Sequence, residues 1–358
     1  ERRTLQPLMQ SLVYCCLSIL EDKTVCSQDM EVDDFDMDMS SQTTHSSIRR
    51  QQVAFRILLK SCKCCLDSEL EQKICEFVRP FLVESSMSCQ DITVFLQSLC
   101  DLAPHQLLEM TMEIVLDFFT GKREWSARSK YLVSIRATAR LLARMSEPGF
   151  PVERKETIVE LARSVLVPLR TKIATGAGVD SIVRKAYIFC LGDLLPLDND
   201  FDFANTILQG LSDPSFLVRF QAVQTLPAIF KTWSATIEVF IDVQKALPDV
   251  SGSAGKEEAL VHTRALAFGQ IAIDQDSCDE VQGFCIFSLC KAYSIHKSEQ
   301  ALIHCILNEV TEATGFHKLA ELLQEHMPSI LCNWMHAGLE WRDFPFKLAG
   351  FATVHEFV

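Results

Sequence analysis

The chain has 358 residues, more than the roughly 250–300 at which one hydrophobic core stops growing, so it forms several domains or an array of repeats. Its net charge of −13 argues against general binding of nucleic acid, which needs an excess of positive charge. Because 48% of its residues are hydrophobic and it holds just 13 Gly and 12 Pro, the composition favours large buried helices over strands.

The first predicted element is a helical repeat in residues 1–26, with an apolar helix near 5–20. The chain begins at Glu1 instead of Met and ends on an apolar run, so we expect it to be a segment of a longer protein. We find neither a signal peptide nor the ~20-residue apolar run that crosses a bilayer, so no membrane association is expected.

An acidic segment follows in residues 27–47. It carries six Asp and Glu residues and no Lys or Arg, and it shows no helical period. Such a composition buries too little apolar surface to order itself, so the sequence predicts a disordered, exposed loop. Two Ser-Gln pairs lie in it, at Ser27 and Ser41.

Residues 48–358 are predicted to form a continuous α-solenoid of degenerate HEAT-like repeats. Apolar residues recur at spacings of three and four, short breaks separate the runs, and no segment alternates as a strand does. Helix pairs that recur every ~35–45 residues with short loops are typical of an α-solenoid. The expected helices span 48–66, 69–83, 90–101, 105–119, 126–146, 152–173, 179–196, 200–210, 213–230, 235–247, 256–273, 278–293, 298–314 and 317–337.

The clearest repeat unit lies in residues 211–230. Asp213 is predicted to cap its helix, with Pro214 in the first helical position, where a missing N–H costs nothing. The unit in residues 179–196 has the same pattern of an aspartate before an apolar helix, with Asp180 as the predicted cap. The two aspartates are 33 residues apart, which is one repeat length.

Two further positions of this unit have predicted roles. Arg219 is expected to pair with carbonyl groups or acids of the neighbouring repeat. The small Ala222 is expected to let the partner helix approach closely. The three-and-four spacing predicts one buried face, which Val218, Ala222 and Ile229 widen; its main residues are Phe216, Phe220, Val223, Leu226 and Phe230.

Positive charge is concentrated in residues 121–185, which hold 14 Lys and Arg against 6 Asp and Glu. Arg136, Arg140 and Arg144 recur there every four residues, so a helix places them in one stripe. Such a stripe suits an acidic partner peptide or a phosphate group, and direct contact with DNA stays open. The candidate partner-binding residues are Lys122, Arg123, Arg128, Lys130, Arg136, Arg140 and Arg144. In the alternative interpretation the stripe is a solvated face that pairs with acids of the adjacent helix, such as Glu153, Glu156 and Glu160.

No catalytic, cofactor-binding or metal-binding motif is found. The stretch Cys62-Lys63-Cys64-Cys65 holds one Cys-x-x-Cys, but a zinc site needs four ligands and no second pair follows at a suitable spacing. The 15 cysteines lie within apolar helical runs, where they act as small hydrophobic residues, so a reducing compartment is expected. The sequence therefore predicts a chain that is not itself an enzyme and that holds no cofactor.

Residues 283–351 resemble the helical spiral of the ataxia-telangiectasia mutated (ATM) kinase family, and the resemblance extends back to about residue 180. It rests on Phe287-Ser288-Leu289-Cys290-Lys291, Glu312-Ala313-Thr314-Gly315-Phe316, His326 with Trp334, and Phe344-Pro345-Phe346. The resemblance implies a non-catalytic scaffold segment of a very large nuclear serine/threonine kinase that responds to DNA double-strand breaks. The ATP-dependent kinase domain would lie outside this chain.

The same resemblance implies partners and modification sites. The chain would contact the rest of the kinase and a sensor complex at broken DNA ends, whose acidic motif would bind the basic stripe. Because the family phosphorylates Ser-Gln sites, Ser27 and Ser41 are candidate phosphorylation sites.

Other classes of helical-repeat protein are alternatives. A transport protein of the importin type would need an acidic inner surface, and an assembly scaffold such as a phosphatase subunit would show more regular repeats of ~39 residues. An enzyme with an unrecognised helical active site is a third interpretation, which an ATP-hydrolysis assay of the chain would test.

Overall fold

The computed structural model describes residues 2–21, 37–65, 68–84, 87–121, 125–174, 179–233, 237–247, 257–274 and 278–351. Within these ranges the ordered secondary structure is entirely helical, which confirms the predicted all-α class. The contacts group the chain into two compact units, Glu1–Gly178 and Val179–Val358. The continuous array from residue 48 stays a prediction. No helix in the described part of the chain is both long enough and apolar enough to cross a bilayer.

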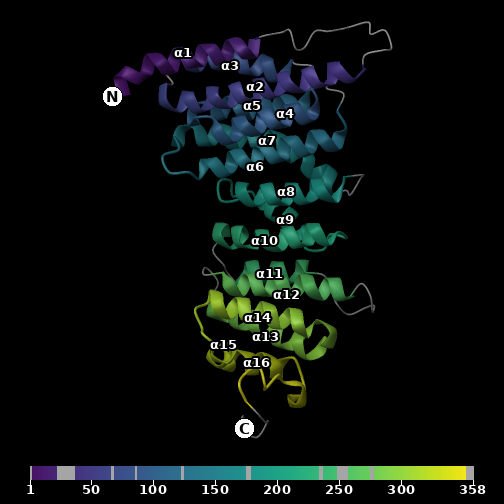
Figure 1. Cartoon of the computed structure of the whole chain (residues 1–358). Helices are drawn as coiled ribbons and strands as arrows, with labels where there is room; N and C mark the ends of the chain where they lie inside the picture. The colour runs from purple at the N-terminus through teal and green to yellow at the C-terminus, as the bar shows by residue number, and fades with distance from the viewer. Residues whose placement is uncertain are drawn as a thin grey trace. The chain divides into compact units, whose positions relative to one another are not determined.

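The first unit arranges its helices in two rows (Figure 1). Helices α2, α4 and α6 pack side by side in one row, helices α3, α5 and α7 pack in the other, and α1 packs on α2. Successive helices from α3 to α7 contact each other across the rows. The elements are α1 (Arg2–Glu21), α2 (Met37–Cys65), α3 (Ser68–Val83), α4 (Cys89–Leu102), η2 (His105–Leu107), α5 (Leu108–Thr120), α6 (Ala127–Met145) and α7 (Val152–Ala174).

Side-chain caps start two helices of this unit. The hydroxyl of Ser88 accepts a hydrogen bond from the Asp91 N–H at 3.2 Å and begins α4. The hydroxyl of Ser126 accepts one from the Ser129 N–H at 3.2 Å and begins α6. Such caps satisfy N–H groups that the first helical turn leaves without a partner, and they fix where α4 and α6 begin.

The start of α2 differs from the prediction. The sequence predicted a loop over residues 27–47, but α2 begins at Met37. Residues 37–47 contain neither Gly nor Pro, and extending an existing helix costs far less than starting one, so the helix continues toward the N-terminus. Residues 22–36 lie outside the described residues, and the predicted disorder there stays a prediction.

The second unit also packs alternate helices together. Helices α8, α10, α12 and α14 form one row, α9 contacts α11, and α13 packs against α12, α14 and α16. The elements are α8 (Ser181–Leu194), α9 (Phe201–Gly210), α10 (Phe216–Trp233), α11 (Ile237–Ala246), α12 (Glu257–Ile273), α13 (Asp279–Ile295), η3 (Lys297–Glu299), α14 (Gln300–Ala313), α15 (Leu319–Glu325), α16 (Met327–His336) and η4 (Trp341–Asp343).

Helix α10 buries most of the predicted face, with one correction. Val223, Leu226 and Phe230 are buried as expected, but Phe216 is 41% exposed and Phe220 is 39% exposed. The three-and-four spacing fits two adjacent faces of a helix. The neighbouring helices α8, α9 and α12 cover the face that does not include Phe216 and Phe220. That face adds Val218, Ala222 and Ile229 to the core.

The expected close approach at Ala222 is confirmed. A side-chain carbon added to Gly210 of α9 would lie 3.1 Å from the Ala222 Cβ. Since real contacts of this kind are seldom so short, a larger residue at either position would push α9 and α10 apart.

The segment predicted as one helix over 317–337 is divided. Helix α15 ends at Glu325 and α16 begins at Met327, with Pro328 in its first turn. Proline fits the first turn of a helix but disrupts an interior turn, so it starts a new helix here.

Candidate functional site

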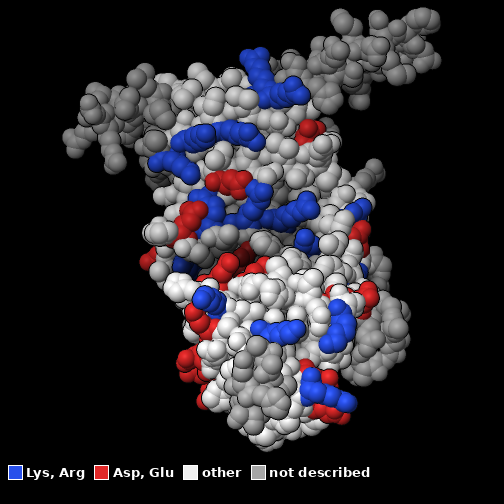
Figure 2. All heavy atoms as spheres, turned by 60° about the horizontal axis from the view of Figure 1, so that its bottom comes forward, with Lys and Arg blue, Asp and Glu red and all other residues white. Residues whose placement is uncertain are grey.

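Helix α6 carries most of the predicted partner-binding residues, but the structure separates them. Arg128 and Lys130 lie in its first turns, where the Lys130 ammonium donates a hydrogen bond to the Gly121 carbonyl oxygen. Lys122 and Arg123 lie outside the described residues. Figure 2 shows one face of the molecule, on which basic side chains lie in rows with acidic side chains close to them.

Arg144 is a structural residue and does not belong to an exposed stripe. Its side chain is buried, and its Nη1 donates to the carbonyl oxygens of Cys100 at 3.0 Å and Ala103 at 2.6 Å. Its Nε donates to Glu147 at 3.2 Å. The carbonyl groups at the C-terminal end of α4 lack partners within the helix, and the Arg144 guanidinium satisfies two of them.

Arg140 is held by α4. Its Nη1 lies 2.5 Å from a carboxylate oxygen of Asp101. The side-chain oxygen of Gln97, with the amide oriented to accept, lies 2.6 Å from Nη2. In the alternative interpretation the paired acids were Glu153, Glu156 and Glu160 of α7, but Arg140 pairs with Asp101 and Arg144 pairs with Glu147.

Arg136 is the exposed member of the three arginines. It makes no ion pair with any of the residues that the structure describes, and it lines a groove of about 280 Å³ between α4 and α6. The charged residues that line this groove are both arginines, Arg136 and Arg140. Its apolar floor is formed by Leu96, Leu132, Val133 and Ala137. A groove with an apolar floor and cationic walls fits an anionic group carried on an apolar segment.

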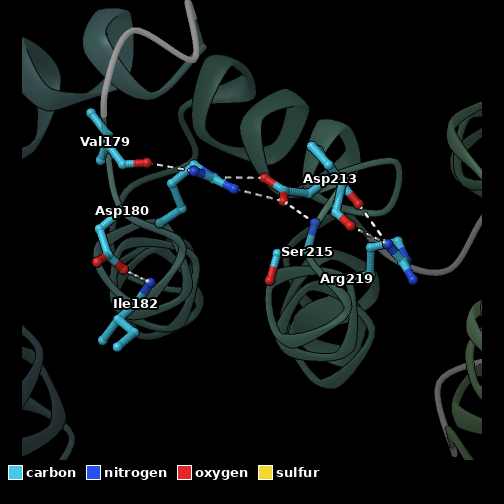
Figure 3. Close-up of polar contacts among 8 residues, drawn as sticks. Val179, Asp180, Ile182, Asp213, Ser215 and Arg219 are labelled. Atoms are coloured by element: carbon cyan, nitrogen blue, oxygen red, sulfur yellow. Dashed lines mark hydrogen bonds and ion pairs between the residues drawn. The ribbon is translucent and has the colours of Figure 1, made fainter.

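In the second unit, Asp213 has a role different from the predicted one. Helix α10 begins at Phe216, so Asp213 precedes it and Pro214 is not its first residue. The Asp213 carboxylate accepts a hydrogen bond from the Ser215 N–H at 2.8 Å and a two-pronged pair from Arg184, at 2.8 and 2.9 Å (Figure 3). The hydrogen bonds to Asp213 raise the pKa of Arg184. Asp213 therefore orders the turn before α10 and ties it to α8.

Asp180 caps α8 as predicted. Its carboxylate accepts a hydrogen bond from the Ile182 N–H at 2.7 Å, as Figure 3 shows. The same aspartate-before-helix pattern in the sequence thus produces a helix cap at Asp180 and an inter-helix ion pair at Asp213.

Arg219 extends these contacts to the next helix. Its guanidinium donates to the carbonyl oxygens of Asp213 and Pro214, at 2.8 and 3.0 Å, and its Nε donates to the Thr263 hydroxyl of α12 at 3.0 Å. The expectation that Arg219 pairs with its neighbours is confirmed, although part of the pairing is within its own turn. From α12, His262 bonds to Glu299 just before α14, so polar contacts link α8, α10, α12 and α14 in turn.

The phosphorylation candidates are only partly within the described structure. Ser27 lies outside the described residues. Ser41 belongs to the first turns of α2, not to a loop, and its side chain lies outside the described part of the structure.

Half of the described cysteines are core residues. Six are buried, namely Cys16, Cys62, Cys100, Cys190, Cys285 and Cys290, whereas Cys15, Cys305 and Cys332 are exposed and Cys75, Cys89 and Cys278 are half-buried. Burial raises the pKa of Cys100 and of Cys290 to about 12, so these thiols are protonated at neutral pH. Among the described side chains, no three His, Cys, Asp or Glu residues converge as a metal site would require.

Comparison with known proteins finds no matching family model. A serine-protein kinase, ATM from Sus scrofa, is 22% identical to this chain over 212 residues. The chain is similar to a part of ATM. The match takes in 49% of this chain and 7% of the ATM chain, so the similarity spans a small part of the length of ATM.

Proposed function

We propose that this chain is a non-catalytic docking segment of a large nuclear serine/threonine kinase related to ATM, which acts in the response to DNA double-strand breaks. Its helices would form an α-solenoid of degenerate HEAT-like repeats. The two rows of helices in the first unit and the polar links from α8 to α14 in the second support this architecture. The similarity to ATM supports the kinase assignment.

The groove between α4 and α6 is the proposed docking site. Arg136 is exposed there without an ion pair among the described residues, while Asp101 and Gln97 hold Arg140 in place. An acidic motif of a break-sensor protein fits this groove, with a carboxylate at Arg136 and an apolar residue on the floor. The proposed partners are this motif and the rest of the kinase. Ser27 and Ser41 stay candidate phosphorylation sites.

The test is a charge reversal in the whole protein. In cells that express the Arg136→Glu variant in place of the wild type, we expect recruitment to double-strand breaks to fall severalfold, because the groove would repel an acidic motif. Basal phosphorylation of a Ser-Gln peptide should not change, because the kinase domain lies elsewhere.

Lys60→Glu is the matched control, since Lys60 is an exposed residue of α2 that does not line the groove. The proposed docking site is wrong if the folded Arg136→Glu protein is recruited normally. A loss of basal phosphorylation would contradict a purely non-catalytic role.

A further inference from the structure

Helices α8 and α10 carry an exposed apolar surface in the second unit. They pack side by side, and a carbon added to Gly192 of α8 would lie 2.7 Å from the Thr225 Cγ2 of α10. Large apolar side chains line the solvent side of both helices, away from the core. We call this surface the apolar face, and its residues are Ile182 and Phe189 of α8 with Phe216, Leu217 and Phe220 of α10.

Helical spacing places these side chains in stripes. Phe189 lies about two turns after Ile182, so both project from one side of α8. Phe216 and Phe220 are one turn apart on α10, and their ring centroids are 6.1 Å apart. Phe189 is 52% exposed. Single exposed apolar residues are ordinary, but a group of them on two adjacent helices marks a contact surface.

Asp193, one turn after Phe189 on α8, adds a charge requirement to this face. Its carboxylate is partly buried, yet it makes neither a hydrogen bond nor an ion pair with any residue that the structure describes. Burial raises the pKa of Asp193 to about 6, because the ionised form has lost water and gained no partner. A Lys or Arg side chain brought by an occupant of the face would stabilise the ionised carboxylate.

These features favour a permanent occupant over a transient one. A transient partner would leave large apolar side chains uncovered between encounters, and such surfaces promote aggregation. A contact within one polypeptide keeps them covered. The similarity to ATM takes in 7% of the ATM chain, so a protein of that size has many further segments that could cover this face.

We propose that the apolar face of α8 and α10 binds another segment of the same, larger protein. That segment is an amphipathic helix, which packs its apolar side chains on Phe189, Leu217 and Phe220. It places a Lys or Arg at Asp193. The proposal rests on the proposed function, in which this chain is one part of a larger protein, and it specifies how the rest of that protein contacts the chain.

Photo-cross-linking in the whole protein tests this contact. The protein is purified from cells with p-benzoylphenylalanine in place of Leu217, irradiated, and digested for mass spectrometry. We expect cross-links to residues of the same polypeptide that lie outside the 358-residue chain. Phe189→Ser and Asp193→Lys should each lower the cross-link yield about fivefold, because the first removes an apolar contact and the second repels the incoming cation.

Glu238→Lys is the matched control. Glu238 is an exposed residue of α11 outside the apolar face, so this charge reversal should leave the cross-link yield unchanged. Thermal unfolding of the isolated chain, followed by circular dichroism, shows whether each variant folds. Phe189→Ser should unfold at nearly the wild-type temperature, because about half of the Phe189 side chain is already in water.

Three results would overturn this proposal. They are no cross-link from the Leu217 position, a cross-link to a different protein or to a second copy, and an unchanged yield in both folded variants of the face. The proposed function has a separate readout, since normal recruitment of the Arg136→Glu protein would contradict the docking site and would not alter the cross-links.

Discussion

The Arg219→Ala variant is expected to lose about 3 kcal/mol of unfolding free energy, one of the two largest effects that we predict for a single substitution. Arg219 is 4% exposed, and its guanidinium satisfies the carbonyl oxygens of Asp213 and Pro214 together with the Thr263 hydroxyl. Alanine would leave the part-buried carbonyl oxygens and the buried Thr263 hydroxyl without their donor, and it would remove the link from α10 to α12. Buried polar groups left without a partner cost about 1–3 kcal/mol each.

Urea unfolding followed by circular dichroism measures this effect. Arg219→Lys should show a smaller loss, because an ammonium group can replace some of the hydrogen bonds but not the planar fork. Arg136→Ala is the surface control and should change stability by no more than about 0.5 kcal/mol. If Arg219→Ala were as mild as this control, the proposed role of Arg219 in joining α10 to α12 would be wrong.

The Trp334→Ala variant should lose about 3–5 kcal/mol of unfolding free energy. Trp334 of α16 is 1% exposed and packs edge-on against Phe287 of α13 and Phe344, at centroid distances of 6.3 and 5.1 Å. Its indole N–H donates to the Glu340 carbonyl oxygen at 3.3 Å. Removing the indole opens a cavity between α13 and α16 and takes away that hydrogen bond.

Two further tryptophan variants serve as comparisons, and urea unfolding measures the stability of all three. Trp334→Phe should lose much less unfolding free energy, because an aromatic ring is kept and mainly the hydrogen bond is lost. Trp341→Ala removes the same side chain from a position that is 41% exposed, so about 1 kcal/mol or less is expected. Equal losses for Trp334→Ala and Trp341→Ala would contradict the packing described here.

Most helices could be predicted from the sequence because their signals are local. The three-and-four spacing located α4, α6 and α8 to within a few residues, and Asp180 marked the start of α8. The start of α2 was missed because its first turns are polar and rich in Ser, with low helix propensity of their own. The helix there depends on continuation from the apolar turns that follow.

The side-chain roles were harder to predict because they depend on neighbouring helices. Arg136, Arg140 and Arg144 share a spacing in the sequence, yet α4 buries Arg144, binds Arg140 and leaves Arg136 exposed. Asp213 likewise matches a helix cap in sequence, but Arg184 of α8 donates two of the three hydrogen bonds to its carboxylate. Only the packing of the helices decides such cases.

We propose that this chain is a non-catalytic part of a serine/threonine kinase. To test this, the whole protein that carries the chain is purified from cells, and its serine phosphotransfer is measured beside that of the isolated 358-residue chain. We expect ATP-dependent phosphorylation of a Ser-Gln peptide by the whole protein and none by the isolated chain. Phosphotransfer by the isolated chain, or its absence from an intact and folded whole protein, would show that the proposed role is wrong.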